Sequence, residues 1–367
     1  MPTINDIFKT YSCQYIERFG DRMPRQHLAV LEAIKDCRTP HCGTIVYTCQ
    51  GCGQMHCTSC SCGNRHCPSC QYQKSQLWLE KQFERQLPGH HFLLTFTLPQ
   101  ELRGEIRRHQ RKGYAAMFSA SSATIKTFAQ DDRWAGGDLP GFFGVLHTWG
   151  RQMPYHPHIH YVVPGGALST NDGKWHPTQN AYFAPVTALS KVYKAKFIDE
   201  MKKAGLYNAI DPGIWRKPFI VHSKAVDHSR PAIKYLAPYV FKVAISNHRI
   251  VKVENDRVFF RYKKHNSNRW RTMSLTAMEF IHRFLQHVLP SGFMKIRYYG
   301  FMSPGSSVDI NDIVALIEQA CRIVAEKIPI SKNKVKTLAP CCPDCKGRLI
   351  FKCFVPAMKR ECMIGSG

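Results

Sequence analysis

The chain has 367 residues, of which 44% are hydrophobic and 11% aromatic, so it is long and apolar enough for two or three domains with buried cores. Its 51 lysines and arginines outnumber 26 aspartates and glutamates, and the formal net charge of +25 indicates a polyanionic partner. The sequence lacks the run of about 18 apolar residues that a membrane span needs, and its first residues lack a secretion signal. We therefore expect a folded cytoplasmic protein without a membrane partner.

The N-terminal part is dominated by cysteines. Residues 1–36 carry a helical pattern and predict a helical lead-in. Nine of the 16 cysteines follow within residues 37–72, interleaved with histidines. In a chain without an export signal, this density indicates metal binding and not disulfides. We expect a small zinc-binding module here.

Two Cys-x2-Cys motifs in this module have a spacing typical of structural zinc sites, in which four thiolates close a tetrahedron. The sequence predicts that Cys49, Cys52, Cys67 and Cys70 bind one zinc ion. Residues 73–88 then predict a linking helix, and residues 91–98 a buried first strand. A basic helix is expected over residues 101–128.

Two predicted strands carry the candidate metal-binding histidines. Gly144 to Trp149 predicts one strand, and Tyr155 to Pro164 predicts the next. Because alternate side chains of a strand share a face, His158 and His160 point the same way and can hold one metal ion. His147 can face the same side from the first strand. The alternative interpretation is an ordinary polar strand face.

The second half continues with a helix over residues 188–204, a strand over 218–222 and a segment that contains Tyr235 and Tyr239. On a helix these two tyrosines lie one turn apart, with Pro238 as a potential kink. Residues 249–263 predict a hairpin and 269–275 a third strand, followed by helices over 277–288 and 309–327. Cys342-x2-Cys345 is a candidate zinc knuckle, although one such pair by itself is weak evidence.

The paired histidines followed by two tyrosines resemble the HUH endonucleases, and within them the IS91-type rolling-circle transposase family. The likeness rests on motifs in collinear order along most of the chain, namely Cys37-Arg38-Thr39, Asn64 to Gln71, Val145 to Gly150, His156 to His160, Ala244 to Asn247, Phe284 to Pro290 and Arg297 to Gly300.

This resemblance implies an α+β fold. It predicts an HUH nuclease domain over residues 89–275 with a central antiparallel sheet flanked by helices, and a helical C-terminal part over 276–367. It implies Mg²⁺ or Mn²⁺ at His158 and His160, with His147 as third ligand, and His156, Gln152 or a residue near Tyr239 as alternatives. It also implies that Cys37, Cys62 and His66 belong to a second zinc site, which His41, Cys42, Cys57 or Cys60 would complete.

The implied function is nicking and rejoining of single-stranded DNA at transposon ends through a 5′-phosphotyrosine on Tyr235 or Tyr239. Hairpin ends are the expected substrates. No Gly-x4-Gly-Lys-[Ser/Thr] motif is present, so we expect unwinding by a host helicase or replication machinery at the bacterial nucleoid. Alternatives are a plasmid replication initiator or relaxase, and a non-catalytic zinc-dependent DNA-binding protein.

Overall fold

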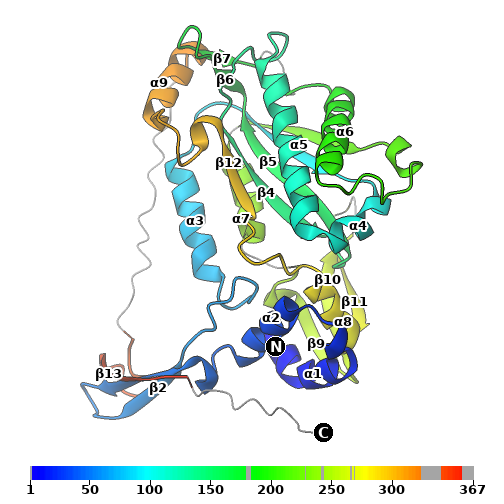
Figure 1. The fold of residues 1–367 in the computed structure, drawn as a ribbon. Helices are drawn as coiled ribbons and strands as arrows, with labels where there is room; N and C mark the ends of the chain where they lie inside the picture. The colour runs from blue at the N-terminus through cyan, green and yellow to red at the C-terminus, as the bar shows by residue number, and fades with distance from the viewer. Residues whose placement is uncertain are drawn as a thin grey trace. The chain divides into compact units, whose positions relative to one another are not determined.

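The structure is a computed structural model that describes residues 2–178, 183–227, 229–240, 244–264, 267, 269–323 and 340–357, without the side chains of residues 72, 73, 229, 235 and 237–239. The chain divides into two compact units. One comprises Met1–Lys74, Phe241–Val288 and Ile330–Gly367, and the other Ser75–Val240 and Leu289–Pro329. Both units are discontinuous in sequence, unlike the linear division expected from the sequence (Figure 1).

The second unit is built on a five-stranded antiparallel sheet with strand order β12-β4-β5-β3-β8. Its strands are β3 (His91–Thr97), β4 (Phe142–Trp149), β5 (Tyr155–Pro164), β8 (Ile220–Val226) and β12 (Ile296–Tyr299). A separate two-stranded ribbon joins β6 (Gly166–Leu168) to β7 (Trp175–Pro177). The antiparallel central sheet agrees with the sequence-based expectation.

Two long helices, α5 (Gln110–Gln130) and α6 (Val186–Lys203), cover one face of this sheet (Figure 1). The core between them is aromatic, with Phe96 of β3, Tyr161 of β5 and Tyr193 of α6 fully buried. Gly144 of β4 lies opposite Tyr161, and a Cβ at this glycine would come within 2.3 Å of the Tyr161 ring. A glycine is therefore required for the ring to cross β4 and fill the core.

The other face is covered by α7 (Ser229–Val240) and by α3 (Tyr72–Glu84), most of which lies in this unit. Trp78 of α3 contacts Phe143 of β4, with ring centroids 5.9 Å apart. Ile233 of α7 lines a small cavity with Phe143 and Val162. Since side chains alternate along β4 and β5, this is the face to which His147, His158 and His160 belong.

The first unit contains a helical part and two small sheets. Helices α1 (Ile4–Phe19), α2 (Arg25–Asp36) and α8 (Ala277–Leu285) pack through contacts such as Phe8 with Phe284, whose centroids are 5.1 Å apart. One sheet is the meander β9 (Ile250–Glu254), β10 (Arg257–Lys263) and β11 (Trp270–Thr276). Its first turn contains Asn255 and Asp256 with positive φ, as the hairpin prediction requires.

The second small sheet has the order β13-β1-β2, with β1 (Thr44–Cys49), β2 (Met55–Ser59) and β13 (Leu349–Val355). The remaining elements are α4 (Arg103–Arg108), α9 (Ile310–Cys321) and the 3-10 helices η1 (Gly20–Arg22), η2 (Pro40–Cys42), η3 (Gln100–Leu102), η4 (Ile214–Arg216), η5 (Asn247–Arg249) and η6 (Gly300–Met302). None of the helices in the described part of the chain has the length and hydropathy to cross a membrane.

The expectation of a helical C-terminal part is wrong for two segments. Residues 296–299 form β12 at the edge of the central sheet, and residues 349–355 form β13 in the small sheet. β12 is short and pairs with β4 about 150 residues earlier, whereas β13 is exposed and pairs with β1 about 300 residues earlier. Local sequence patterns therefore do not predict either strand. The end of the helix predicted over 309–327 lies outside the described residues.

Candidate functional site

Three histidines converge on the sheet face that α7 covers. His147 of β4 lies directly opposite His158 of β5, and His160 follows two residues later on the same face. Their ring centroids are 4.6 to 5.3 Å apart, and one nitrogen from each ring lies within 4.8 Å of the others. Among the alternative third ligands, His156 does not belong to this group, and Gln152 is exposed.

Hydrogen bonds orient two of the three rings. Nδ1 of His158 donates to the carbonyl oxygen of His156 at 2.7 Å, and Nδ1 of His160 is 2.9 Å from Oγ1 of Thr95 on β3. In both rings Nε2 is then the nitrogen available to a metal, an arrangement typical of metal-binding histidines. Sequence analysis missed Thr95, although its position opposite His160 follows once the β3–β5 register is known.

Burial keeps these imidazoles neutral. It lowers the pKa of His158 to about 4, and it holds the pKa values of His147 and His160 well below the usual value, because protonated rings this close together would also repel one another. At neutral pH the site therefore offers unprotonated nitrogens that need not lose a proton to bind a cation. The donor set fits a divalent ion, and three imidazoles suit the first-row transition metals better than Mg²⁺.

The segment with the two tyrosines is helical and lies against this sheet. Helix α7 packs on β3, β4, β5 and β8, and its backbone runs without interruption from Ser229 through Pro238 to Val240. Ile233 and Leu236 are buried on its inner side. The side chains of Tyr235 and Tyr239 lie outside the described part of the structure, so the prediction that they are nucleophiles stays a prediction.

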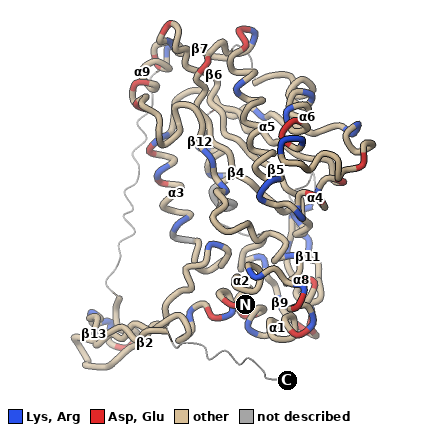
Figure 2. The backbone as a smooth tube through the Cα atoms, in the orientation of Figure 1, with Lys and Arg blue, Asp and Glu red and all other residues tan. Residues whose placement is uncertain are grey.

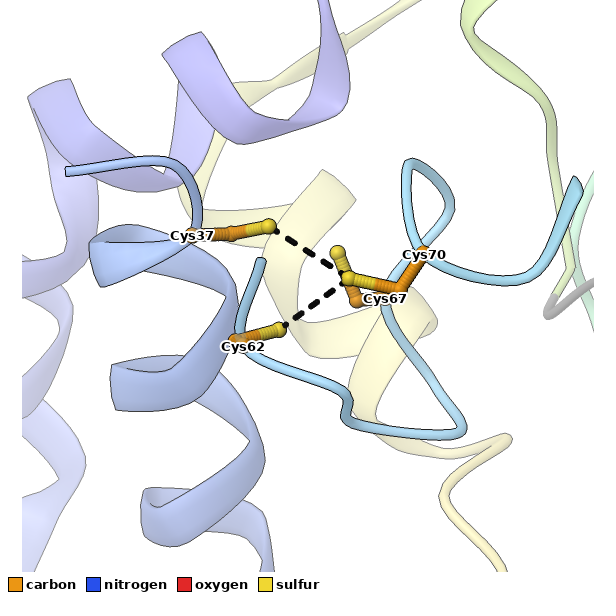
Figure 3. Close-up of side chains that lie close together, drawn as sticks. All are labelled: Cys37, Cys62, Cys67 and Cys70. Atoms are coloured by element: carbon orange, nitrogen blue, oxygen red, sulfur yellow. Dashed lines mark hydrogen bonds between the residues drawn. The ribbon is translucent and has the colours of Figure 1, made fainter. Parts of the chain in front are cut away.

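Four cysteines form a second cluster, in the first unit. Cys37 follows α2, Cys62 lies in the loop after β2, and Cys67 and Cys70 share one turn. Their sulfurs point toward one another (Figure 3), with Sγ of Cys70 3.5 Å from Cys37 and 3.6 Å from Cys62. The side-chain amide of Asn5 in α1 lies 3.8 Å from Sγ of Cys67 and donates to the carbonyl of Ile34 in α2.

This cluster needs a cation for its thiols to ionise together. The hydrogen bond from Cys62 lowers the pKa of Cys67 to about 5, whereas burial raises the pKa of Cys37 to about 12. The pKa of Cys62 is also raised, mainly through its hydrogen bond to Cys67. A bound zinc ion would favour the thiolate form of all four cysteines.

The predicted grouping of cysteines is wrong. The structure does not bring Cys49 and Cys52 to Cys67 and Cys70 but to Cys342 and Cys345, while Cys37 and Cys62 complete the other cluster. His66 is buried, but it belongs to neither cluster. The reason is strand pairing. Because β1 pairs with β13, the knuckle that precedes β13 lies beside Cys49. The spacing of cysteines within residues 37–72 does not predict this contact.

Basic side chains accompany both units. Figure 2 shows lysines and arginines along α3 and α6 as well as in the first unit. In that unit, β10 and β11 present Trp270, which is 53% exposed, with Nζ of Lys263 5.5 Å from its ring centroid. An exposed aromatic ring beside a cation can stack on a base and contact a phosphate.

Comparisons with known proteins identify relatives of the chain. A family model described as "Putative transposase" matches residues 141–308, and one described as "Transposase zinc-binding domain" matches residues 7–98. The chain is 34% identical to "Putative transposase y4qJ" of Sinorhizobium fredii, over 82% of this chain and 80% of that protein. It is 28% identical to "Transposase for insertion sequence element IS801" of Pseudomonas savastanoi pv. phaseolicola over 182 residues, 44% of this chain and 43% of that one. No solved structure matches.

A cysteine-rich module and a mixed helix and sheet fold, with these relatives, define a DNA transposase. The protein belongs to the IS91-type transposase family. The family's zinc-binding domain and the cysteine clusters together support structural zinc in the protein.

Proposed function

We propose that the protein is an HUH-type endonuclease and strand transferase, which nicks and rejoins single-stranded DNA at transposon ends during rolling-circle transposition. The observation that carries this proposal is the convergence of His147, His158 and His160 on the sheet face against which the helix of Tyr235 and Tyr239 packs. A metal site and a tyrosine nucleophile on one face are the two parts that metal-assisted phosphodiester transfer requires.

The chemistry assigns a role to each part. Bound at the three histidines, a divalent ion would supply positive charge to the non-bridging oxygens of the scissile phosphate. The phenol oxygen of Tyr235 or Tyr239 attacks phosphorus and its proton passes to water. The bond from phosphorus to the 3′ oxygen breaks, and the departing 3′ oxygen takes a proton from water. The products are a 5′-phosphotyrosine and a free 3′-hydroxyl, so a later strand can be joined without ATP.

A further positive charge lies at this site. Burial is the main cause of the low pKa values of His156 and His158, and the charge of Arg103 lowers both further. Nε of Arg103 is buried and has no hydrogen-bond partner among the residues that the structure describes. The nearby carboxylate of Glu101 is already paired with Lys217. A partly buried guanidinium with a donor to spare, close to a metal site, suits a substrate phosphate.

Arg103→Gln is expected to lower the single-turnover rate of strand cleavage by about 100-fold, as loss of an electrostatic stabiliser does elsewhere. Mn²⁺ binding should be as tight as in the wild type or tighter, because a repelling charge has been removed. Arg108→Gln is the matched control, since Arg108 is exposed on the same helix and pairs with Glu105 at 2.8 Å. Equal effects of the two substitutions would contradict a role for Arg103 at the scissile phosphate.

The substrate follows from the charge and from the exposed aromatic surface. A formal net charge of +25 and the Trp270 surface support binding of single-stranded DNA, including hairpin ends, at the bacterial nucleoid. Strand separation would fall to a host helicase or to the replication machinery. A replication initiator or relaxase uses the same chemistry, and the transposase relatives favour the transposon role.

The proposal is tested by cleavage of a labelled single-stranded oligonucleotide that carries the element's end, with Mn²⁺ or Mg²⁺, on a denaturing gel. Wild type, Tyr235→Phe, Tyr239→Phe and the double variant are compared. We expect a covalent protein–DNA adduct that the double variant has lost, because phenylalanine has no attacking oxygen. Loss in one single variant would identify a single nucleophile.

The non-catalytic alternative makes a different prediction for the same gel. A zinc-dependent DNA-binding protein would retard the oligonucleotide in a native gel, yet form no adduct with either metal. That result for wild-type protein would overturn the nuclease assignment.

A further inference from the structure

Two Cys-x2-Cys knuckles from opposite ends of the chain meet in the first unit. Cys49 is the last residue of β1 and Cys52 lies in the turn after it, whereas Cys342 and Cys345 precede β13. Sγ of Cys49 is 3.3 Å from Cys345, and Sγ of Cys52 is 3.8 Å from Cys342, across 296 and 290 positions in sequence. All four sulfurs lie within 4.8 Å of one another. The match to the family's zinc-binding domain ends at residue 98, so it does not include the second knuckle.

The two knuckles have the same backbone turn. The amide of Cys49 donates to the carbonyl of Gln54, and that of Cys342 donates to Gly347, at 2.9 and 2.8 Å. The residue four positions after the first cysteine, Gly53 or Lys346, donates back to that cysteine's carbonyl at 3.0 Å in both knuckles. Both residues have positive φ. Such turns leave the two sulfurs of each knuckle on one side, as tetrahedral zinc sites require.

Amide groups also point at the sulfurs. The amide of Gly51 donates to Sγ of Cys49 at 3.3 Å, and that of Gly347 donates to Sγ of Cys345 at 3.4 Å. A Cβ at Gly347 would lie 3.0 Å from Sγ of Cys49, so glycine allows the backbone to approach the cluster this closely. Donors of this kind stabilise thiolates and not thiols.

Among the described residues, the sheet that carries this cluster has only a very small hydrophobic core. Its buried set is Cys49, Cys342 and Leu349, with Tyr47 packed against them. Six of the seven residues of β13 are exposed, among them Phe351 at 58%. So little apolar burial does not offset the cost of closing a loop of nearly 300 residues and ordering three strands. Small modules of this kind are usually held by a metal.

We propose that Cys49, Cys52, Cys342 and Cys345 bind a second structural zinc ion, which fastens the C-terminal β13 segment to the N-terminal β1–β2 hairpin. The zinc-binding module is then assembled from both ends of the chain. This site is independent of the three histidines, and its test does not depend on DNA cleavage.

A rival donor set shares one of these cysteines. His56, Cys342 and Asp344 also come within reach of one ion, with Nε2 of His56 3.2 Å from Sγ of Cys342. The rival set has only three donors, and the Asp344 side chain is 61% exposed and 4.0 Å from His56. Four thiolates form a closed tetrahedral site, which this set cannot. Cys52 belongs to the four-thiol set alone, so its substitution distinguishes the two.

The first experiment is zinc content, measured by elemental analysis of the purified full-length chain after removal of loosely bound metal. We expect two zinc ions per chain in wild type and one in Cys52→Ser and in Cys345→Ser. Both cysteines are exposed, so these variants should still fold. Cys57→Ser, exposed on the same hairpin but outside both clusters, should keep two ions. A zinc content in Cys52→Ser equal to that of the wild type would overturn the four-thiol site.

A second experiment tests whether zinc holds the C-terminal β13 segment on the β1–β2 hairpin. A recognition site for a sequence-specific protease is inserted within residues 324–339, and cleavage is verified on a denaturing gel. The C-terminal fragment should co-elute with the rest of the chain in gel filtration, and it should separate after treatment with a zinc chelator or in the Cys52→Ser background. Retention of the fragment without zinc would show that strand pairing alone holds it, and would contradict the proposed role.

Discussion

Replacement of His160 by glutamine is expected to reduce DNA cleavage at a fixed Mn²⁺ concentration by at least about 100-fold, because even an outer partner of a metal ligand costs 10 to 100-fold in affinity or activity. His160 is 7% exposed and lies beside Thr95. Glutamine is close in size and keeps a hydrogen-bonding group for Thr95, yet it removes the imidazole nitrogen. The loss should therefore be in metal binding, measured by calorimetric titration with Mn²⁺, with partial recovery of cleavage at high Mn²⁺.

A matched control is His176→Gln. His176 lies on β7 and pairs with Asp172 at 2.9 Å, away from the converging rings. This variant should bind Mn²⁺ and cleave as the wild type does. Wild-type cleavage and Mn²⁺ affinity in His160→Gln would exclude the three-histidine site as the metal centre. In the wild type we expect Mn²⁺ to bind more tightly than Mg²⁺, since all three donors are imidazoles.

Cys67→Ser should remove one zinc ion and unfold the helical part of the first unit. Structural zinc contributes an apparent ~10–16 kcal/mol in small zinc modules, which equals or exceeds the whole stability of an ordinary domain at about 5–15 kcal/mol. Cys67 is fully buried, and Asn5 links its knuckle to α1 and α2. Thermal denaturation followed by circular dichroism, together with zinc content, measures the loss.

Cys13→Ser serves as the control for this substitution. Cys13 is exposed on α1 and takes part in neither cluster, so zinc content and melting temperature should be unchanged. If Cys67→Ser keeps two zinc ions and melts with the wild type, the cluster of Cys37, Cys62, Cys67 and Cys70 does not hold a structural metal.

Much of the histidine site follows from local periodicity. Alternation along a strand is a local property, so His158 and His160 were expected on one face, and His147 was expected to share it from the preceding strand. The meander of β9, β10 and β11 also follows from local signals, because its Asn255-Asp256 turn and its alternating residues lie within one short stretch. The chain's basic charge likewise requires no structure to interpret.

Other parts of the site depend on contacts between distant segments. Arg103 and Thr95 are ordinary residues of a helix and a strand until the β3–β5 register and the packing of α4 against β5 bring them to the histidines. A single sequence contains no local signal for these contacts. The sequence also does not predict which face of the sheet α7 covers. In the structure, the buried side chains of Ile233 and Leu236 show which side of α7 packs on the sheet.

The cysteines show most clearly which features local sequence predicts and which depend on contacts between distant segments. The Cys-x2-Cys knuckles, the basic charge and the IS91-type pattern are all evident from the residues alone, because a knuckle is a turn of four residues. Which knuckles share a cluster depends on contacts between distant segments in the folded chain. The antiparallel pairing of β1 with β13 places Cys49 beside Cys345. Because strand pairing and burial select this partner nearly 300 residues away, the spacing of cysteines along the chain does not predict it.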